Sequence, residues 1–139
     1  MRGVEHKGDE KLTLLELVLR VHGEFRRSLE PIRVTPLQAG VLLFLRRHAG
    51  AKVTDAAAAL GVRLPTLSEV VKDLIRKRWV IKRRSIMDTR VVHLSLSRRG
   101  QVITRKIENQ VRRVSTGVAA NTVLTAAVLH RVSAQLKEA

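Results

Sequence analysis

Cysteine and tyrosine are absent from this chain of 139 residues, and its only aromatic residues are two phenylalanines and one tryptophan. Without cysteine, the chain has no disulfide, no catalytic thiol and no thiol redox sensor. Leu, Val, Ile and Ala must build the core, which favours helices over a β-sandwich or barrel. The sequence also lacks an apolar run of about 18 residues and a signal-peptide pattern. We therefore expect one soluble, cytoplasmic, mainly helical domain.

Negative charge is scarce, with 12 Asp and Glu against 27 Lys and Arg and a net charge of +15 at pH 7. The imbalance is steepest between Lys72 and Arg113, which hold 14 Lys and Arg against 3 Asp and Glu. Such a concentration indicates a polyanionic partner, first of all nucleic acid. A membrane surface is a weaker candidate because the stretch lacks the broad apolar face of an interfacial helix. A solvated basic surface without a partner is the remaining alternative.

Apolar periodicity, together with start and stop residues, predicts a mainly α fold with one small β-hairpin. Thr35, Pro36 and Gln38 form a capping box, and Gly50 can end the helix that follows. Thr54 and Ser97 are predicted to cap two further helices. The predicted helices cover about 11–29, 36–48, 55–60, 65–77, 98–116 and 121–137, and the predicted strands cover 79–84 and 91–96.

The two terminal segments carry more apolar surface than a small domain would bury. The first helix has Leu15, Val18 and Phe25 near one face, which further apolar residues broaden, and residues 123–136 are similarly apolar. We therefore predict a homodimer, with dimerisation helices in 11–32 and 101–139.

Between these segments, residues 34–98 have the pattern of a DNA-binding lobe. Two short helices joined through Gly61 predict a helix-turn-helix unit. The second of them should bury a stripe of apolar side chains, namely Leu67, Val70, Val71, Leu74 and Ile75. A basic hairpin follows directly, as the wing does in a winged helix-turn-helix.

In this order and spacing the chain resembles the MarR family of regulators from about Leu12 onward. The likeness rests on Val34-Thr35-Pro36-Leu37-Gln38, on Gly61-Val62-Arg63-Leu64-Pro65-Thr66-Leu67-Ser68, on Asp88-Thr89-Arg90, and on Leu94-Ser95-Leu96-Ser97-Arg98-Arg99-Gly100. It implies one winged helix domain over 1–139, and a transcriptional regulator, usually a repressor, that binds a palindromic operator in double-stranded DNA. Two positions depart from the family: Arg63 replaces a small capping hydroxyl, and Glu69 replaces a basic or polar residue that contacts bases.

The candidate DNA-binding residues lie on the second short helix and on the hairpin. Short hydroxyls near a helix N-terminus suit phosphates or base edges, a proline ring can contact a thymine methyl, and a lysine can reach backbone oxygens. The resemblance places Arg90 in the minor groove, with Asp88 orienting it or a nearby arginine by an ion pair. Of Arg83 and Arg84, at most one can face DNA, because neighbouring strand residues point to opposite sides. The full candidate set is Pro65, Thr66, Ser68, Glu69, Lys72, Arg83, Arg84 and Arg90.

By analogy with the family, a small aromatic or anionic effector would bind between the dimerisation helices and the DNA-binding lobe. The residues that this analogy places near the cleft are His22, Phe25, Arg26, Phe44 and Arg47. A polar group on an apolar helix face is also commonly a plain core or interface residue. The lack of cysteine argues against a peroxide-sensing member.

No catalytic pattern, metal-ligand spacing or cofactor motif stands out, so we expect neither an enzyme nor a metal or cofactor. The main alternative is an architectural or weakly specific nucleic-acid-binding protein, which the charge and Glu69 would both suit. An RNA-binding protein is less well supported because stacking aromatics are lacking.

Overall fold

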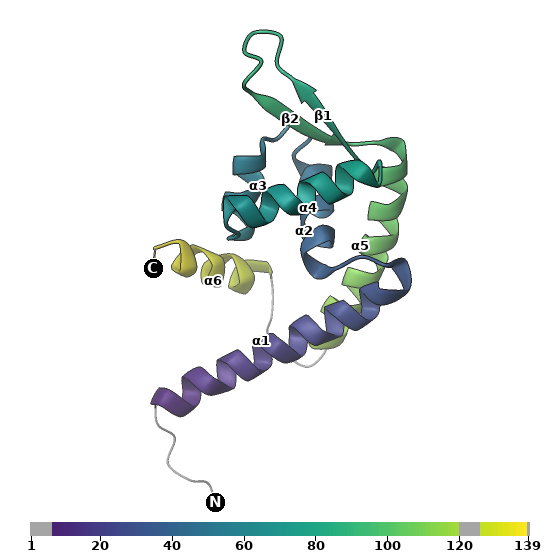
Figure 1. The fold of residues 1–139 in the computed structure, drawn as a ribbon. Helices are drawn as coiled ribbons and strands as arrows, with labels where there is room; N and C mark the ends of the chain where they lie inside the picture. The colour runs from purple at the N-terminus through teal and green to yellow at the C-terminus, as the bar shows by residue number, and fades with distance from the viewer. Residues whose placement is uncertain (1–6, 120–125, 139) are drawn as a thin grey trace, which may run out of the picture.

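The elements follow one another as helix, helix, helix-turn-helix, hairpin and two further helices (Figure 1). This computed structural model describes residues 7–119 and 126–138. Its elements are α1 (Lys7–Leu29), the 3-10 helix η1 (Glu30–Ile32), α2 (Pro36–Arg47), α3 (Val53–Leu60), α4 (Leu64–Arg76), β1 (Val80–Arg84), β2 (Val92–Leu96), α5 (Arg98–Ala119) and α6 (Ala126–Glu138). The predicted mainly α fold with one hairpin is therefore confirmed. The predicted start of the last helix, at 121–122, lies outside the described residues.

The helix α2 begins as its sequence predicts. The Gln38 backbone N–H donates to Thr35 Oγ1 at 3.1 Å, and the Thr35 N–H donates to Gln38 Oε1 at 3.0 Å. The helix ends at Arg47, slightly before the predicted region. Gly50 lies beyond it with a φ of +86°, and its N–H donates to the Leu94 carbonyl. This glycine therefore shapes the connection to the hairpin rather than the helix end.

The helix-turn-helix unit is confirmed, but its first cap is not the predicted one. Lys52, not Thr54, is the N-cap of α3, and its backbone N–H donates to Asp55 Oδ2 at 2.9 Å. An acidic side chain at the third helical position can satisfy the cap N–H as Glu or Gln does in a capping box. Gly61 ends α3 in the left-handed conformation, with a φ of +64°.

The hairpin joins β1 and β2 in antiparallel register, with Val80 opposite Leu96 and Arg84 opposite Val92. Ala51 adds an isolated bridge to Leu94, so the segment before α3 is attached to the hairpin. Leu94 is buried at this junction. The hairpin therefore extends from the core of the lobe and projects beyond its helices (Figure 1).

The core lies between α2, α4, the base of the hairpin and α5. The predicted stripe of α4 packs as expected, with Leu67, Val71 and Leu74 buried and the other two partly buried. On α5, Ile107 is fully buried, whereas Val102 is 51% exposed. The position facing the core there is Thr104, whose hydroxyl donates to the Gly100 carbonyl at 2.6 Å.

The helices α1 and α5 pack against each other below the lobe (Figure 1). Much of the apolar surface of α1 is left uncovered by its own chain, as Leu14, Leu15, Leu17, Val18 and Leu19 are all more than half exposed. No helix in the described ranges has both the length and the apolar character needed to cross a bilayer.

Candidate nucleic-acid interface

The helix α4 presents its polar side away from the core. Pro65, Thr66, Glu69 and Lys72 are exposed, while Ser68 is only half-exposed at the edge of the packed face. The N-cap Arg63 makes no side-chain cap hydrogen bond, and Pro65 occupies the first turn, where its missing N–H costs nothing. The remaining N–H groups of this turn are thus available to an anion.

The two charged residues in the middle of α4 are neighbours. Lys72 Nζ lies 3.5 Å from Glu69 Oε1, and both side chains are well exposed. A pair this exposed contributes little stability. Its consequence is electrostatic, because Lys72 partly offsets the carboxylate that would otherwise repel a phosphate.

Asp73 has its carboxylate turned toward α2. Its Oδ2 accepts from the Gln38 side-chain amide at 2.7 Å, and its carboxylate also contacts Arg76 and Lys77 at 3.2 and 3.4 Å. Gln38 thereby caps α2 and attaches α4 to α2. The sequence analysis missed this positioning role, since a contact across 35 residues leaves no local signal.

The wing carries Arg83, Arg84 and Arg90, all exposed. Arg84 Nη1 donates to the Thr89 carbonyl at 2.9 Å, so its guanidinium braces the tip of its own hairpin. The backbone of Arg83 pairs with His93 in the hairpin, but its side chain makes no hydrogen bond or ion pair with another described residue. Of the two neighbours, Arg83 is therefore the better candidate for a contact outside the chain.

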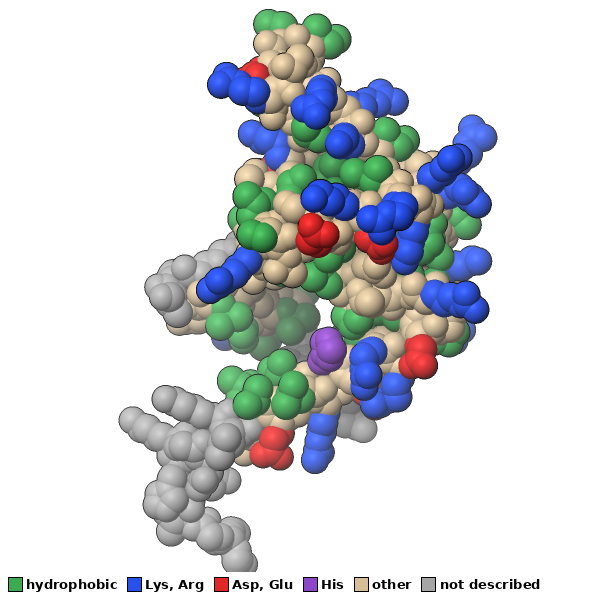
Figure 2. Space-filling view, in the orientation of Figure 1, with side chains coloured by type: hydrophobic (Ala, Val, Ile, Leu, Met, Phe, Trp, Pro, Cys, Tyr) green, Lys and Arg blue, Asp and Glu red, His purple; other side chains and the backbone are tan. Residues whose placement is uncertain are grey.

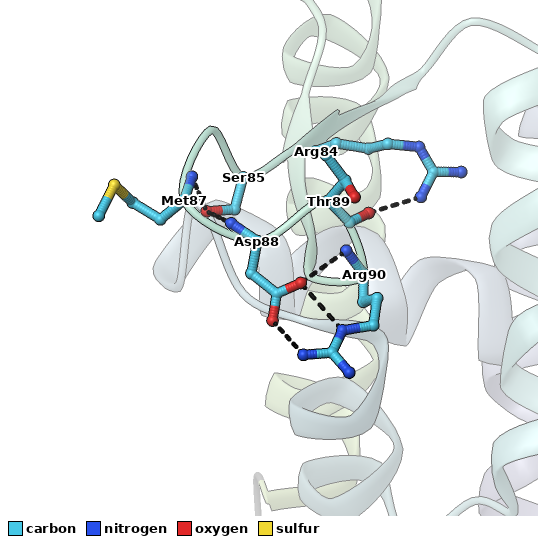
Figure 3. Close-up of polar contacts among 6 residues, drawn as sticks. All are labelled: Arg84, Ser85, Met87, Asp88, Thr89 and Arg90. Atoms are coloured by element: carbon cyan, nitrogen blue, oxygen red, sulfur yellow. Dashed lines mark hydrogen bonds and ion pairs between the residues drawn. The ribbon is translucent and has the colours of Figure 1, made fainter.

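Asp88 and Arg90 form the predicted ion pair at the wing tip (Figure 3). Arg90 Nε and Nη2 donate to the two carboxylate oxygens at 3.1 and 3.2 Å, and the Arg90 backbone N–H donates to Oδ1 at 3.0 Å. These bonds, the side-chain ones first, hold the pKa of Asp88 below its ordinary value of 3.8, against a smaller opposing effect of burial. The Arg90 side chain is nevertheless 90% exposed, so Asp88 orients it without covering it.

Positive charge surrounds these elements. In Figure 2, Lys and Arg side chains gather around the hairpin and beside α4, with few acidic ones between them. The exposed cations of α4, the preceding turn and the hairpin are Arg63, Lys72, Arg76, Lys82, Arg83, Arg84 and Arg90. The helix and the wing thus form one basic surface.

The predicted effector residues are not gathered around one cavity. Phe44 is 7% exposed and belongs to the core, where its ring lies against that of His48. His22, Arg26 and Arg47 are exposed. Phe25 alone of the five lines a cavity of about 550 Å³ between α1, α5 and α6.

The walls of that cavity are largely apolar, formed mainly by Leu17, Val18, Val21, Phe25 and Leu129.

Within residues 7–119 and 126–138, no cluster of three His, Asp or Glu could hold a metal ion.

Residues 34–90 match the MarR family. The transcriptional repressor MdtR of Bacillus subtilis is 30% identical over 94 residues, a match that covers 68% of this chain and 61% of that repressor. The structure of BldR from Sulfolobus solfataricus has a TM-score of 0.78 at 18% identity, covering 97% of this chain and all of that one. A DNA complex of Staphylococcus aureus MepR has a TM-score of 0.77 at 20% identity, covering 92% and 93%. Residues 34–90, which include the helix-turn-helix and most of the hairpin, thus match the MarR family, and the overall fold of the chain is similar to that of the solved structures of BldR and MepR.

Proposed function

We propose that this protein is a sequence-specific regulator of transcription that binds double-stranded DNA as a homodimer. The observation that carries the proposal is the joint basic surface of α4 and the wing, in which Asp88 aims an exposed Arg90 outward from the hairpin tip. A helix fits the major groove, and an arginine on a narrow loop fits the minor groove. Pro65, Thr66, Ser68 and Lys72 are the proposed contacts from the helix.

Repression is the mode we propose, because the relative MdtR is a repressor. A dimer with two such surfaces would bind a palindromic operator. This function needs no catalytic group or cofactor, and it is carried out in the cytoplasm, with the DNA. The domain division into dimerisation helices (11–32, 101–139) and a DNA-binding lobe (34–98) is part of the proposal.

Release by a small effector is a secondary part of the proposal. Its support is the apolar cavity beside Phe25, which lies between the helices α1, α5 and α6. An apolar or aromatic molecule fits such walls better than an anionic one, because a buried charge needs a partner there. Thermal stability of the protein with and without a panel of small aromatic compounds measures this directly.

The test of the main proposal is selection of bound sequences from random duplex DNA. We expect a palindromic consensus, with half-sites about one helical turn apart. Binding without any consensus would support the alternative of an architectural protein, for which Glu69 and the high charge are the favouring features. Salt dependence alone does not separate the two, because phosphate contacts dominate both.

A further inference from the structure

Two large apolar side chains stand at the very tip of the basic wing. Ile86 is 99% exposed and Met87 is 94% exposed, the highest values among the exposed large hydrophobic residues of the described chain. In Figure 2, the top of the molecule carries hydrophobic side chains, with Lys and Arg side chains below them. Neither residue was selected by the sequence analysis, although two apolar residues inside a charged turn were a visible signal.

Their exposure does not come from an unstructured tip. Ser85 Oγ accepts from the backbone N–H groups of Met87 and Asp88 at 3.2 and 3.4 Å (Figure 3). The Ser85 N–H donates to the Val91 carbonyl, and the Val91 N–H donates to the Asp88 carbonyl. With the Asp88–Arg90 pair and the Arg84–Thr89 bond, the loop is held in one shape that turns the Met87 side chain outward. Little further ordering is needed before it can bind, which lowers the cost of association.

The charges next to this tip restrict its partner. Lys82, Arg83, Arg84 and Arg90 are all exposed on the same hairpin, and Asp88 is already paired. An apolar end flanked by cations matches the minor groove of DNA, where phosphates line the walls and base edges form the floor. Proteins that bind this groove often insert Ile, Met, Leu or Phe between base pairs.

We propose that Ile86 and Met87 form an apolar wedge that enters the minor groove and partly unstacks one base step. The wing then favours sequences that deform easily, such as TA or CA steps, at a position where Arg90 contacts the groove wall. The wedge adds specificity without a hydrogen bond to a base. This inference rests on the proposed function, because it requires that the protein binds duplex DNA.

An anionic lipid surface has related chemistry and is the rival partner. DNA is favoured because α4, with its exposed polar face and free N-terminal amides, belongs to the same basic surface as the wing. Two side chains at a narrow tip also offer far less apolar area than an interfacial membrane helix.

The test compares two double variants of the full-length protein. Ile86→Ser with Met87→Ser removes the wedge, and Ile86→Leu with Met87→Leu keeps an apolar tip of similar size. Because both side chains are exposed and pack on nothing, neither variant should change the fold. Each protein is titrated at several salt concentrations against the selected operator, in which 2-aminopurine replaces the flanking bases one at a time.

We expect the wild type and the Leu variant to raise 2-aminopurine fluorescence at one step on each side of the operator. The Ser variant should lose this signal, bind about tenfold more weakly, and no longer prefer a TA step over a stiff A-tract there. Its salt dependence should stay unchanged, since no charge is removed. Arg90→Ala, in contrast, should lower the salt slope by about one unit.

Two outcomes would overturn the wedge and leave the proposed function intact. One is operator binding by the wild type with no unstacking signal and no loss in the Ser variant. The other is tip-dependent binding to phosphatidylglycerol vesicles while operator binding is the same in all variants, which would identify a membrane contact. If the wild type selects no duplex sequence at all, the proposed function itself fails, and the wedge with it.

Discussion

Among the glycines that the structure describes, Gly100 is the one with least room for a side chain. A Cβ built on it would lie 2.0 Å from the Trp79 carbonyl oxygen. The same corner is closed by Ser97, whose hydroxyl donates to the Arg78 carbonyl at 2.6 Å and accepts the Gly100 N–H at 3.0 Å. The start of α5 is therefore pressed against the end of α4 and the start of β1, where the wing leaves the lobe.

We predict that Gly100→Ala lowers the free energy of unfolding by more than about 2 kcal/mol, because backbone must shift to admit the methyl group. The matched control is Gly117→Ala in the same helix, where no described residue other than its chain neighbours and the helix's own backbone comes within 4 Å of the added Cβ. That variant should be neutral or stabilising by about 0.4–1 kcal/mol. Urea denaturation measures both, and an equal effect of the two substitutions would contradict the close approach.

Asp88 gives a prediction about pH. Its carboxylate is stabilised by Arg90, so its pKa in the folded wing lies below the ordinary 3.8. The stabilisation from the Asp88–Arg90 pair is therefore complete above the ordinary pKa of an aspartate. It is lost only as the pH falls through the lower pKa that Asp88 has in the folded protein. We expect the Asp88 carboxyl ¹³C shift and the Arg90 Nε signal to stay constant from about pH 8 down to about pH 5. A midpoint at or above 3.8 would contradict the pairing, and Asp88→Asn should abolish the titration.

At the scale of elements, the placement of α4 depends on α2. The N-terminus of α4 has no side-chain cap, and its middle is attached through Asp73 to Gln38, which is itself part of the α2 capping box. Gln38 thus caps the N-terminus of α2 and also helps to fix the orientation of α4.

We predict that Gln38→Glu destabilises the protein by about 1–2 kcal/mol. Glutamate keeps the acceptor for the Thr35 N–H, but it loses the amide donor and places a second carboxylate beside Asp73. In the double variant Gln38→Glu with Asp73→Asn, the new asparagine amide at position 73 can donate to the new glutamate at position 38. We therefore expect most of the lost stability to be recovered. Chemical denaturation of the single and double variants is the measurement, and additive losses would rule out a direct contact.

We expect different residues of α4 to contact bases and phosphates. Ser68→Ala should narrow the affinity gap between operator and random DNA, by about 1–3 kcal/mol, with little change in salt slope. Lys72→Ala should weaken both DNAs together and flatten the slope by about one unit. Because Lys72 offsets Glu69, Glu69→Gln in the Lys72→Ala background should restore part of the affinity. If Ser68→Ala weakens both DNAs equally, Ser68 contacts phosphate instead.

For the whole molecule, the uncovered apolar surface of the terminal helices is the dominant feature. Besides the residues of α1, Leu129, Val132 and Leu136 of α6 are 58%, 52% and 72% exposed. Contiguous apolar surface of this kind usually marks an interaction site. A second copy of the chain, packed through α1 and α6, is the partner we propose.

We predict that Leu15→Arg with Leu19→Arg, one helical turn apart on α1, weakens the dimer by about 100-fold or more. Burying two leucines contributes several kcal/mol, and charges in their place would have no partner. Ile86→Arg is the control, because it also replaces an exposed apolar residue by arginine but lies at the wing tip. Sedimentation at micromolar concentration should show the control as a dimer, and an unchanged dimer in the α1 variant would exclude this interface.

Features made by residues close together in the chain could be predicted from the sequence alone. The Thr35–Gln38 capping box, the Asp88–Arg90 pair, the Ser97 cap and the buried stripe of α4 all appear as expected. Each depends on the spacing of three or four residues or on helical periodicity, which the chain carries with it wherever it folds. The excess of Lys and Arg after residue 72 is likewise a property of composition.

Only the tertiary structure decided the features that join distant segments. It turned Asp73 inward to Gln38, left Val102 exposed, and brought Gly100 against Trp79. It also left Ile86 and Met87 almost fully exposed at the wing tip. The physical reason is that burial and long-range hydrogen bonds depend on which elements meet, and the pattern of any single element does not contain that information.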